Sequence, residues 1–511
     1  MTRAIILILI GALIGIVLLP YFFIRQPEMP AGTDLKSLPL PFENAELLID
    51  RTTWNPETRS HILGHEIFKG ILQEVKAAET FLIVDFFLWN PWTGGLEPGK
   101  VMPDLSQQLA NALIAKRLSQ PDMPILVITD PVNRIYGGHA PSFFEQLAAV
   151  DIPVVFTDLN RLPDSNRIYA PQARFWSRYF GSNHAQSLDG KGPLPNPFDP
   201  EGEGLSWSAF GRLLYFKANH RKVLVSGRSD GNAHLIIGSL NPADGSAFHS
   251  NMAVRVDGAV ARYAAESELA VAEWSVEEAA HTDAGAKQLA LATVGTIRDQ
   301  LSKKDFQAAS AGEATVQWLS EGAIRRSMIE VIDQAGAGAQ LDGAIFYFSD
   351  RLMVKALSAA IERGVEVRLL MDLNRDAFGR EKSGIPNRAV AAELMRLASE
   401  GQIMVRWAAT HGEQFHTKAL RVRSADADLL SLGSSNWTRR NMGNLNLEAN
   451  LKFSGDTELG QSFDRYFESL WTNDTGYVES LPYEDEAESG WSLKWKTWLY
   501  RFQEWSGAST F

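Results

Sequence analysis

The apolar positions of this chain follow the same order twice. Short apolar runs alternate with segments whose apolar residues recur at helical spacing, which predicts strands alternating with helices. The predicted strands are residues 81–88, 125–129 and 154–156 in the first copy and residues 343–348, 365–371 and 403–407 in the second. The accompanying helices are predicted at residues 61–78, 105–118, 142–149, 328–335, 352–363 and 389–399. Such alternation favours parallel strands with helices on the faces of the sheet.

The length of the chain and the repeat together predict two fused copies of one domain. A chain of 511 residues is too long for one ordinary core, and a repeat this long indicates domain duplication instead of a solenoid. We predict an α/β fold of two halves, residues 31–310 and 311–475, each a mixed, largely parallel sheet flanked by helices. Residues 1–30 and 476–511 are predicted to lie outside the halves.

An uncharged apolar run occupies residues 4–24. Its 21 residues exceed the length of about 20 that a helix needs to cross a bilayer. A cleaved signal peptide is the alternative, but no small-x-small cleavage site follows cleanly. We therefore predict a single transmembrane helix as an anchor. Residues 26–42 contain four prolines and are predicted to form a tether beyond it.

The first half contains an insertion that the second half lacks. Asp130 ends the second predicted strand and lies 90 residues before His220, whereas the equivalent Asp372 lies 44 residues before His416. The additional residues fall between about 160 and 215 and include Phe175, Trp176, Tyr179, Phe180, Phe198, Trp207 and Phe210, with Arg174 and Arg178 among them. A substrate lid or membrane-dipping loop and a locally packed excursion are both consistent with this composition.

Two segments outside the repeat have helical character. Residues 261–310 are rich in Ala, Glu and Gln and predict two helices that join the halves. Near the C-terminus, an acidic run precedes one helical stripe of aromatic side chains, Trp491, Trp495, Trp498, Phe502 and Trp505. Such a helix suits the headgroup layer of a membrane, and docking of the stripe on the protein core is the alternative.

Composition limits the possible functions. The chain has no cysteine, which excludes disulfides and thiolate metal sites. Its net charge of −12 argues against a broadly basic nucleic-acid-binding protein. His61 and His65 are four residues apart on a predicted helix but have no third candidate ligand nearby, so we predict no metal site.

A pair of short motifs recurs at the same place in both halves. The motif residues are His220, Lys222, Ser239 and Asn241 in the first half and His416, Lys418, Ser434 and Asn436 in the second. In each copy the histidine and the lysine are two residues apart, so one face of a strand presents both. The asparagine follows the histidine by 21 residues in the first copy and by 20 in the second. This arrangement resembles the phospholipase D superfamily, whose signature is H-x-K-x4-D followed by G-S-x-N, present twice.

The resemblance covers about residues 47–475 and is closest to bacterial cardiolipin synthases and related phosphatidyltransferases. It implies that the halves pack face to face and that both motifs line one site. By the same resemblance, His220 is the nucleophile that forms a covalent phosphohistidine, and His416 is the acid that protonates the leaving oxygen and then acts as base. The motif lysines neutralise the phosphate oxygens, and the asparagines and serines donate hydrogen bonds to them. This chemistry requires no metal and no other cofactor.

The sequence departs from the family signature after each lysine. The family aspartate lies five residues after the lysine, where this chain has Gly227 and Arg423. An aspartate instead lies eight residues after the lysine, at Asp230 and Asp426. These two residues either take over a supporting role or are exposed turn residues of a lengthened hairpin.

A second departure distinguishes the two halves from each other. Asn446-Leu447-Glu448 follows the second motif as an N-x-E segment does in bacterial cardiolipin synthases, whereas the comparable Asn251-Met252-Ala253 lacks the acid. We predict that Glu448 orients a motif histidine; a surface charge on a strand is the alternative. The asymmetry suits different roles for the two histidines.

These observations predict a membrane-associated phosphodiesterase or phosphatidyltransferase acting on glycerophospholipids. We expect a single-pass protein of a bacterial inner membrane with its catalytic part on the periplasmic side, because the charges flanking the apolar run slightly favour this topology. Its expected partners are the phospholipid membrane and the lipid substrate, without nucleic acid. A membrane-tethered nuclease of the same superfamily and a non-catalytic scaffold are the alternatives, and the intact motifs in both halves argue against the scaffold.

Overall fold

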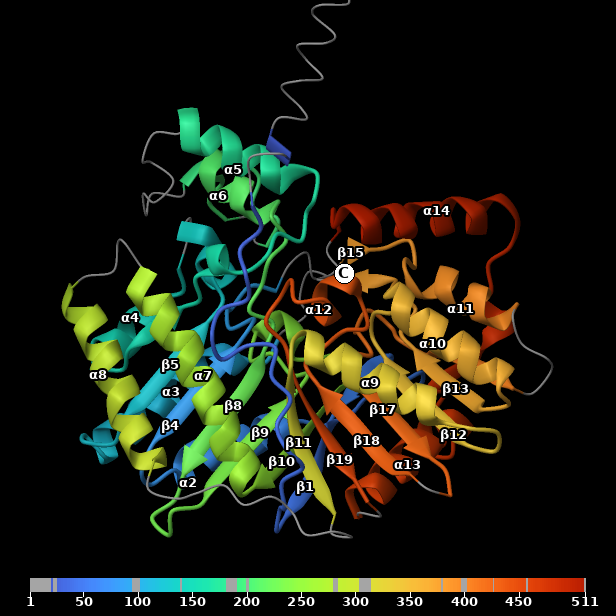
Figure 1. The fold of residues 1–511 in the computed structure, drawn as a ribbon, viewed down its shortest axis with the longest axis horizontal. Coiled ribbons are helices and arrows are strands. Elements are labelled where there is room, and N and C mark those ends of the chain that lie inside the picture. The colour runs from blue at the N-terminus through green and yellow to red at the C-terminus, as the bar shows by residue number, and fades with distance from the viewer. Residues whose placement is uncertain are drawn as a thin grey trace, which may run out of the picture.

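Two mixed β-sheets form the centre of the molecule, one in each half of the chain (Figure 1). The computed structural model describes residues 20–21, 25–93, 102–137, 140–180, 191–198, 202–278, 284–302, 314–377, 380–396, 402–425, 427–455 and 458–509. The predicted transmembrane helix over residues 4–24 thus lies outside the described residues, apart from residues 20–21. None of the described helices combines the length and the apolar character that crossing a bilayer demands.

The two sheets repeat one strand order. The first is ordered β1 (Ala45–Asp50), β10 (Asn251–Asp257), β9 (Ala233–Gly238), β8 (Lys222–Gly227), β4 (Leu82–Phe86), β5 (Ile125–Thr129) and β6 (Val154–Phe156). The second is ordered β11 (Thr315–Ser320), β19 (Ala449–Ser454), β18 (Asp428–Gly433), β17 (Lys418–Arg423), β12 (Gln340–Ile345), β13 (Glu366–Met371), β16 (Ile403–Ala408) and β20 (Ser480–Pro482). The first seven positions correspond one to one, which confirms the predicted α/β fold of two similar halves.

Strand direction corrects one part of the prediction. In the first sheet β4, β5 and β6 run parallel, as predicted, but every other pairing is antiparallel. The second sheet shows the same division, with β12, β13 and β16 parallel and its other pairings antiparallel. The sheets are therefore mixed but not largely parallel. The physical reason is that each H-x-K strand returns through a tight hairpin, which permits only antiparallel pairing.

Helices cover the sheets and join the halves (Figure 1). In chain order they include α2 (Glu66–Ala77), α3 (Leu105–Ser119), α4 (Ser142–Ala148), α7 (Ala259–Glu278), α8 (Ala284–Leu301), α9 (Gly322–Gln334), α10 (Arg351–Glu362), α11 (Asn387–Met395) and α13 (Glu458–Thr472). The two predicted joining helices are α7 and α8. The prediction of a helix from residue 61 was wrong, because His61 belongs to β3 (Ser60–Leu63), which pairs with β2 (Thr52–Asn55).

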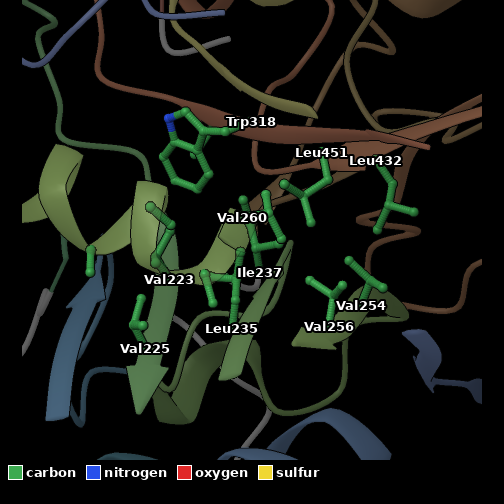
Figure 2. Packing of buried hydrophobic residues seen from close by; sticks show 14 of the residues in the cluster. Val223, Val225, Leu235, Ile237, Val254, Val256, Val260, Trp318, Leu432 and Leu451 are labelled. Atoms are coloured by element: carbon green, nitrogen blue, oxygen red, sulfur yellow. The ribbon is translucent and has the colours of Figure 1, made fainter. Parts of the chain in front are cut away.

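One hydrophobic core is shared by both halves. Figure 2 shows Val223, Ile237 and Val254 of the first sheet facing side chains of the second half, among them Trp318 and Leu451. All five are at most 1% exposed. Such close burial of apolar side chains is the main stabilising contribution in a fold of this kind. The shared core fixes the two sheets relative to each other and brings the motif strands together.

The segment predicted to be a tether is instead part of the fold. Leu40 pairs with Val316 of β11, with a backbone N···O distance of 2.9 Å from Leu40 to Val316, and Ser37 N donates to Trp318 O at 3.0 Å. Leu40 is 3% exposed. Its prolines do not prevent this, because the segment lies along an edge strand, where few backbone donors are required.

The insertion and the C-terminal tail lie at the same edge of the molecule. The insertion contains α5 (Tyr169–Phe180), β7 (Lys191–Leu194) and α6 (Trp207–Leu213), and the tail forms α14 (Gly490–Ser506). Figure 1 shows α5 and α6 at the upper left of the view and α14 at the upper right. Leu205 and Ala209 of the insertion form a small core with Ile135 of the preceding segment, which supports the interpretation as a packed excursion.

Candidate active site

The two motif histidines lie directly before β8 and β17, the strands at the middle of the two sheets. Their backbones pair across the halves. His220 N donates to Leu447 O at 2.9 Å, and His416 N donates to Ser250 O at 2.8 Å. Each histidine is thus held by the segment that follows the G-S-x-N motif of the opposite half, which brings both motifs into one site.

Each imidazole is also held at Nδ1 by a residue of the opposite half. His220 Nδ1 lies 2.8 Å from Oε1 of Glu448, and His416 Nδ1 lies 3.0 Å from Oδ1 of Asn251. The two histidines are only 7% and 6% exposed. At His416 the acceptor at Nδ1 fixes the tautomer that carries a proton there, and at His220 the carboxylate beside Nδ1 favours the same tautomer, so Nε2 is left available for chemistry. The structure therefore places the Glu448 carboxylate directly beside a motif histidine.

Glu448 and Asn251 occupy equivalent positions in the two halves. Ser434 Oγ donates to Glu448, and Ser239 Oγ donates to Asn251 Oδ1. Each serine also accepts from the backbone N–H of the residue that follows its partner, Ala449 after Glu448 and Met252 after Asn251. The predicted match of Asn251-Met252-Ala253 with Asn446-Leu447-Glu448 makes Ala253 the counterpart of Glu448, and this prediction was wrong by two residues. The cause is that the equivalent residue lies ten residues after Asn241 in the first half but twelve after Asn436 in the second, and the strand register reveals the correct match.

The two motif serines therefore have a different place from the one predicted. Both side chains are fully buried and are engaged with the partners of the histidines. They position Glu448 and Asn251 instead of pointing free donors at a phosphate. Substituting either serine would act on the site through these partners.

Two aspartates that the sequence analysis used only as landmarks support the histidines. Asp130 Oδ2 accepts from Asn219 N at 2.7 Å, and Asp372 Oδ2 accepts from Phe415 N at 2.7 Å. Each carboxylate thus holds the backbone just before a motif histidine. The available signal was their position, because both follow the second predicted strand of their half. Burial raises the pKa of Asp130 to about 7.

The motif lysines are buried beside the imidazoles. Lys222 Nζ donates to His220 O at 2.6 Å and Lys418 Nζ donates to His416 O at 2.8 Å. An aromatic ring lies under each pair: Phe87 and Phe346 have ring centroids 4.7 Å from those of His220 and His416, respectively, and also lie about 5 Å from the lysine ammonium groups. The site is thus a symmetric cluster of two histidines and two lysines.

The motif asparagines are buried close to the same cluster. Asn241 is 4% exposed and its Oδ1 accepts from Leu88 N at 3.3 Å. Asn436 is 5% exposed, and its Oδ1 has no hydrogen-bond partner among the residues that the structure describes. The amide of Asn241, held by its oxygen, can turn its NH₂ group toward an anionic ligand.

Burial and positive charge keep the imidazoles neutral. Burial is the main cause that lowers the pKa of His220 and His416 well below the usual value, and the charges of Lys222 and Lys418 lower it further. Burial also lowers the pKa of Lys222 to about 7 and raises the pKa of Glu448 to about 8. A bound phosphodiester anion would offset the lysine charges and allow one imidazole to take up a proton.

A further cation near the site was not predicted. Arg440 follows Asn436 by four residues, and its charge is among the causes that lower the pKa of His220 after burial and the two lysines. Its Nη1 donates to Ser509 O at 2.7 Å. The signal available in the sequence was the pair of arginines three and four residues after Asn436, the last residue of the second G-S-x-N motif.

Of the two other predicted supporting residues, Asp230 is not brought to the site. Asp230 lies in the exposed turn between β8 and β9, where its Oδ1 accepts from Asn232 N at 2.8 Å. Asp426 lies outside the described residues. Among the described residues there is no group of three or more side chains suited to hold a metal ion; His61 Nε2 lies 2.7 Å from Oε2 of Glu413, and His65 Nε2 lies 2.9 Å from Ala247 O.

Comparison with solved structures shows a similar fold in the first of the three chains described next, and the other two align with lower TM-scores. Phosphatidylserine synthase from Haemophilus influenzae Rd KW20 aligns over 92% of this chain and 96% of its own length, with 11% identity and a TM-score of 0.53. Nuc, a phospholipase D family member from Salmonella typhimurium, aligns over 34% of this chain and 99% of its own, with 21% identity and a TM-score of 0.26. Polyphosphate kinase from Porphyromonas gingivalis aligns over 91% and 53%, with 10% identity and a TM-score of 0.44.

Comparison by sequence gives a family match for part of the chain. No curated protein matches the chain. Residues 328–471 match the family model described as the cardiolipin synthase, phospholipase D-like domain. That segment carries the second motif, and the first half repeats its fold and its motif residues in the same site. Residues 328–471 therefore belong to the phospholipase D superfamily.

Proposed function

We propose that this protein is a membrane-associated phosphatidyltransferase that acts on glycerophospholipids through a phosphohistidine intermediate. The observation that carries the proposal is the crossed pair of histidines, each buried beside a lysine and held at Nδ1 by the opposite half. The match of residues 328–471 to a cardiolipin synthase domain supports a lipid substrate.

In the first step Nε2 of His220 attacks phosphorus, and a P–N bond forms. The bond from phosphorus to the leaving alkoxide breaks, and His416 transfers a proton to that oxygen so that it leaves as an alcohol. Lys222 and Lys418 balance the negative charge on the phosphoryl oxygens, and the amides of Asn241 and Asn436 donate hydrogen bonds to it.

In the second step an acceptor replaces the leaving alcohol. A hydroxyl of a second lipid, or water, loses its proton to the now neutral His416 and attacks phosphorus. The P–N bond breaks and His220 is released in its starting form. Transfer to a lipid alcohol gives a larger phospholipid such as cardiolipin, whereas transfer to water gives phosphatidic acid.

The unequal partners of the two imidazoles support this division of roles. Phosphorylation of His220 leaves positive charge on its ring, which the carboxylate of Glu448 at Nδ1 stabilises. The neutral amide of Asn251 gives His416 no such charge. Its imidazolium therefore stays more acidic and releases a proton more readily to the leaving oxygen.

We also propose that the apolar run of residues 4–24 anchors the protein to a bacterial inner membrane, with the site on the periplasmic side. The length of the run and its lack of charge support the anchor. The slight excess of flanking positive charge at its N-terminal end supports the orientation. Reporter fusions at the C-terminus that are active only outside or only inside the cytoplasm would test the orientation.

The function is tested with purified full-length protein, phosphatidylglycerol vesicles and EDTA, with the lipid products identified by mass spectrometry. We expect the wild type to form cardiolipin or phosphatidic acid, and we expect His220→Ala and His416→Ala to form neither. The product also decides between transfer and hydrolysis. Loss of lipid turnover in the wild type, together with cleavage of single-stranded DNA, would overturn the proposal in favour of a membrane-tethered nuclease.

A further inference from the structure

The aromatic stripe of α14 faces away from the protein. Trp491, Trp495, Trp498, Phe502 and Trp505 are 86%, 59%, 55%, 38% and 58% exposed. Neighbouring rings contact one another, with centroids 5.1 Å apart for Trp495 and Trp498 and 5.6 Å apart for Trp498 and Phe502. Docking of the stripe on the protein core, the alternative left open by the sequence, was therefore wrong. A continuous exposed aromatic surface of this kind marks an interaction site.

Polar residues on the opposite side hold α14 in this orientation. Tyr500 is fully buried, accepts from Arg351 at 2.6 Å and donates to Glu393 at 2.9 Å. Glu504 is 7% exposed and bonds Ser349. A helix normally buries its apolar face and exposes its polar face. Here the arrangement is reversed, and the buried polar contacts fix it.

The C-terminal end of α14 is fixed against the insertion. Arg167 N donates to Ser506 O at 2.7 Å. Gly507 has φ of +72°, and a Cβ at this position would lie 1.7 Å from Ser165 O, so only glycine permits the close approach. The exposed stripe and the insertion thus belong to one continuous edge of the molecule.

The same edge is where the chain arrives from the apolar run of residues 4–24. Tyr21 OH donates to Ile168 O at 3.2 Å, and Gln26 accepts from Asp164 N at 2.6 Å. On the insertion, Trp207 is 72% exposed. Figure 1 shows α14 and the insertion at this edge, with residues 20–21 beside α5. If residues 4–24 cross a bilayer, the exposed aromatic side chains lie on the side of the molecule that faces it.

Charge and shape also fit a lipid surface. Lys494 places its ammonium 5.6 Å from the ring of Trp491, and such basic side chains beside tryptophan suit anionic headgroups. A groove of about 660 Å³ runs along α14 and is lined by apolar side chains that include Leu493 and Phe502, with Arg396 among its polar residues. An apolar groove next to a cation matches the acyl chain and phosphate of a phospholipid.

We propose that the aromatic face of α14 lies in the headgroup layer of a phospholipid bilayer and holds the active site against that surface. The inference deepens the proposed function and rests on it for the choice of lipid as partner. Arg439 connects this face to the site, because its backbone N–H and side chain bond Glu504 and it lies three residues after the motif residue Asn436. The helix that contacts lipid is thus joined directly to the catalytic motif.

The experiment uses single spin labels in the full-length protein. Because the chain has no cysteine, Trp498→Cys provides one labelling position on the aromatic face. Leu118→Cys is the matched control, because Leu118 is an apolar residue that is 68% exposed near the end of α3. Collision of the label with oxygen and with a water-soluble nickel complex is measured in vesicles of phosphatidylglycerol and phosphatidylethanolamine.

We expect the label at residue 498 to lose at least tenfold in collision with nickel relative to oxygen when vesicles are present, and the label at residue 118 to stay unchanged. A label at residue 498 that remains as accessible to nickel as the control would overturn the inference. Turnover of short-chain phosphatidylglycerol below its micellar concentration, measured on the wild type, tests the proposed function separately because it needs no bilayer.

A second variant tests whether the surface serves catalysis. Trp495→Ser combined with Trp498→Ser should lower turnover of vesicle lipid about tenfold and leave turnover of the dissolved short-chain lipid unchanged. The side chains are exposed, so the melting temperature should not fall. Equal turnover of vesicle lipid by the double variant and the wild type would contradict a role for this face in lipid contact.

Discussion

Replacing Glu448 by glutamine tests the electrostatic role of the residue that holds His220. Oε1 of Glu448 lies 2.8 Å from His220 Nδ1 and also accepts from Asn441 Nδ2, while Oε2 accepts from Ser434 Oγ. Two donors meet at Oε1, so a glutamine fits in one orientation, with its oxygen there and its NH₂ toward the serine hydroxyl, which can accept. The Nδ1–H tautomer of His220 is therefore kept, and only the charge is lost.

The magnitude follows from this geometry. A hydrogen bond to a charged group contributes about 1.5–3 kcal/mol, and a neutral one about 0.5–1.5 kcal/mol. The transition state should therefore lose about 1–1.5 kcal/mol, which corresponds to a decrease in kcat of about tenfold. Burial raises the pKa of Glu448 to about 8, so the charge does not stabilise the folded protein at rest, and the melting temperature should not fall in the glutamine variant. The carboxylate form is drawn on during reaction, when positive charge develops on the His220 ring beside it.

The assay is steady-state turnover of phosphatidylglycerol, with kcat and KM determined separately for the wild type and Glu448→Gln. We expect kcat to fall about tenfold and KM to stay unchanged, because the carboxylate acts on the charge that develops during reaction. An unchanged kcat would show that the carboxylate does not assist His220. A loss beyond a thousandfold would show that the tautomer was disturbed, which would refute the orientation derived for glutamine.

Three further predictions address the partner of His416, the helix α14 and its end. Asn251→Asp places a carboxylate at Nδ1 of His416 and raises the pKa of that imidazole, so the pH optimum of turnover should move upward; an unmoved optimum would count against the assignment of the acid. Burial raises the pKa of Glu504 from 4.5 to about 7, so the folded protein binds the extra proton and its stability falls as pH rises through that window. The melting temperature of Glu504→Gln relative to the wild type should therefore increase from pH 5 to pH 8, and a constant difference would contradict the pKa shift. Gly507→Ala and Gly490→Ala both place alanine at positive φ, but only the first brings Cβ against a carbonyl, whereas nothing lies within 4 Å of the second. Denaturant unfolding should show that Gly507→Ala costs about 1–3 kcal/mol more than Gly490→Ala, and equal costs would show that α14 can shift.

The fold could be predicted from the sequence where periodicity decides the structure. The buried runs at residues 81–88 and 125–129 are too apolar and too short for surface helices, and they became β4 and β5 as predicted. The prediction contained too little antiparallel pairing. The spacing of the H-x-K and G-S-x-N motifs implies a hairpin, and therefore antiparallel strands, but the predicted strand directions were based on the apolar runs alone. Near residue 61 the apolar spacing is consistent with both a helix and a strand. The segment forms a strand because it pairs with β2.

The candidate site could be predicted only where a motif names its residues. The two histidine–lysine pairs meet in the structure because the motif strands are equivalent in a duplicated fold. The crossed partners could not be predicted, since Glu448 approaches a histidine 228 residues away in the sequence, and such contacts depend on how the halves pack. The supporting role of Asp130 was missed for the same reason, because its partners are backbone N–H groups that no sequence pattern marks.

The orientation of α14 shows a further limit of sequence patterns. The aromatic stripe defines one face of a helix, and that spacing is identical for a face on a protein core and a face on lipid. The polar contacts on the other face of α14 determine whether the aromatic face points to the protein core or away from it. Tyr500 and Glu504 are buried although their residue types are usually exposed or only partly buried. Their partners come from distant parts of the second half, which the sequence does not reveal.

The central claim is that His220 forms the covalent intermediate and His416 supplies the proton. The most direct measurement uses His416→Ala with a phosphatidyl ester of p-nitrophenol, whose leaving group departs without a proton. We predict a burst of about one p-nitrophenolate per protein, no further turnover, and a phosphatidyl adduct on His220 found by peptide mass spectrometry. The absence of a burst in His416→Ala would contradict the account. So would the absence of an adduct on His220 in that variant together with an adduct on His416 in the converse variant His220→Ala.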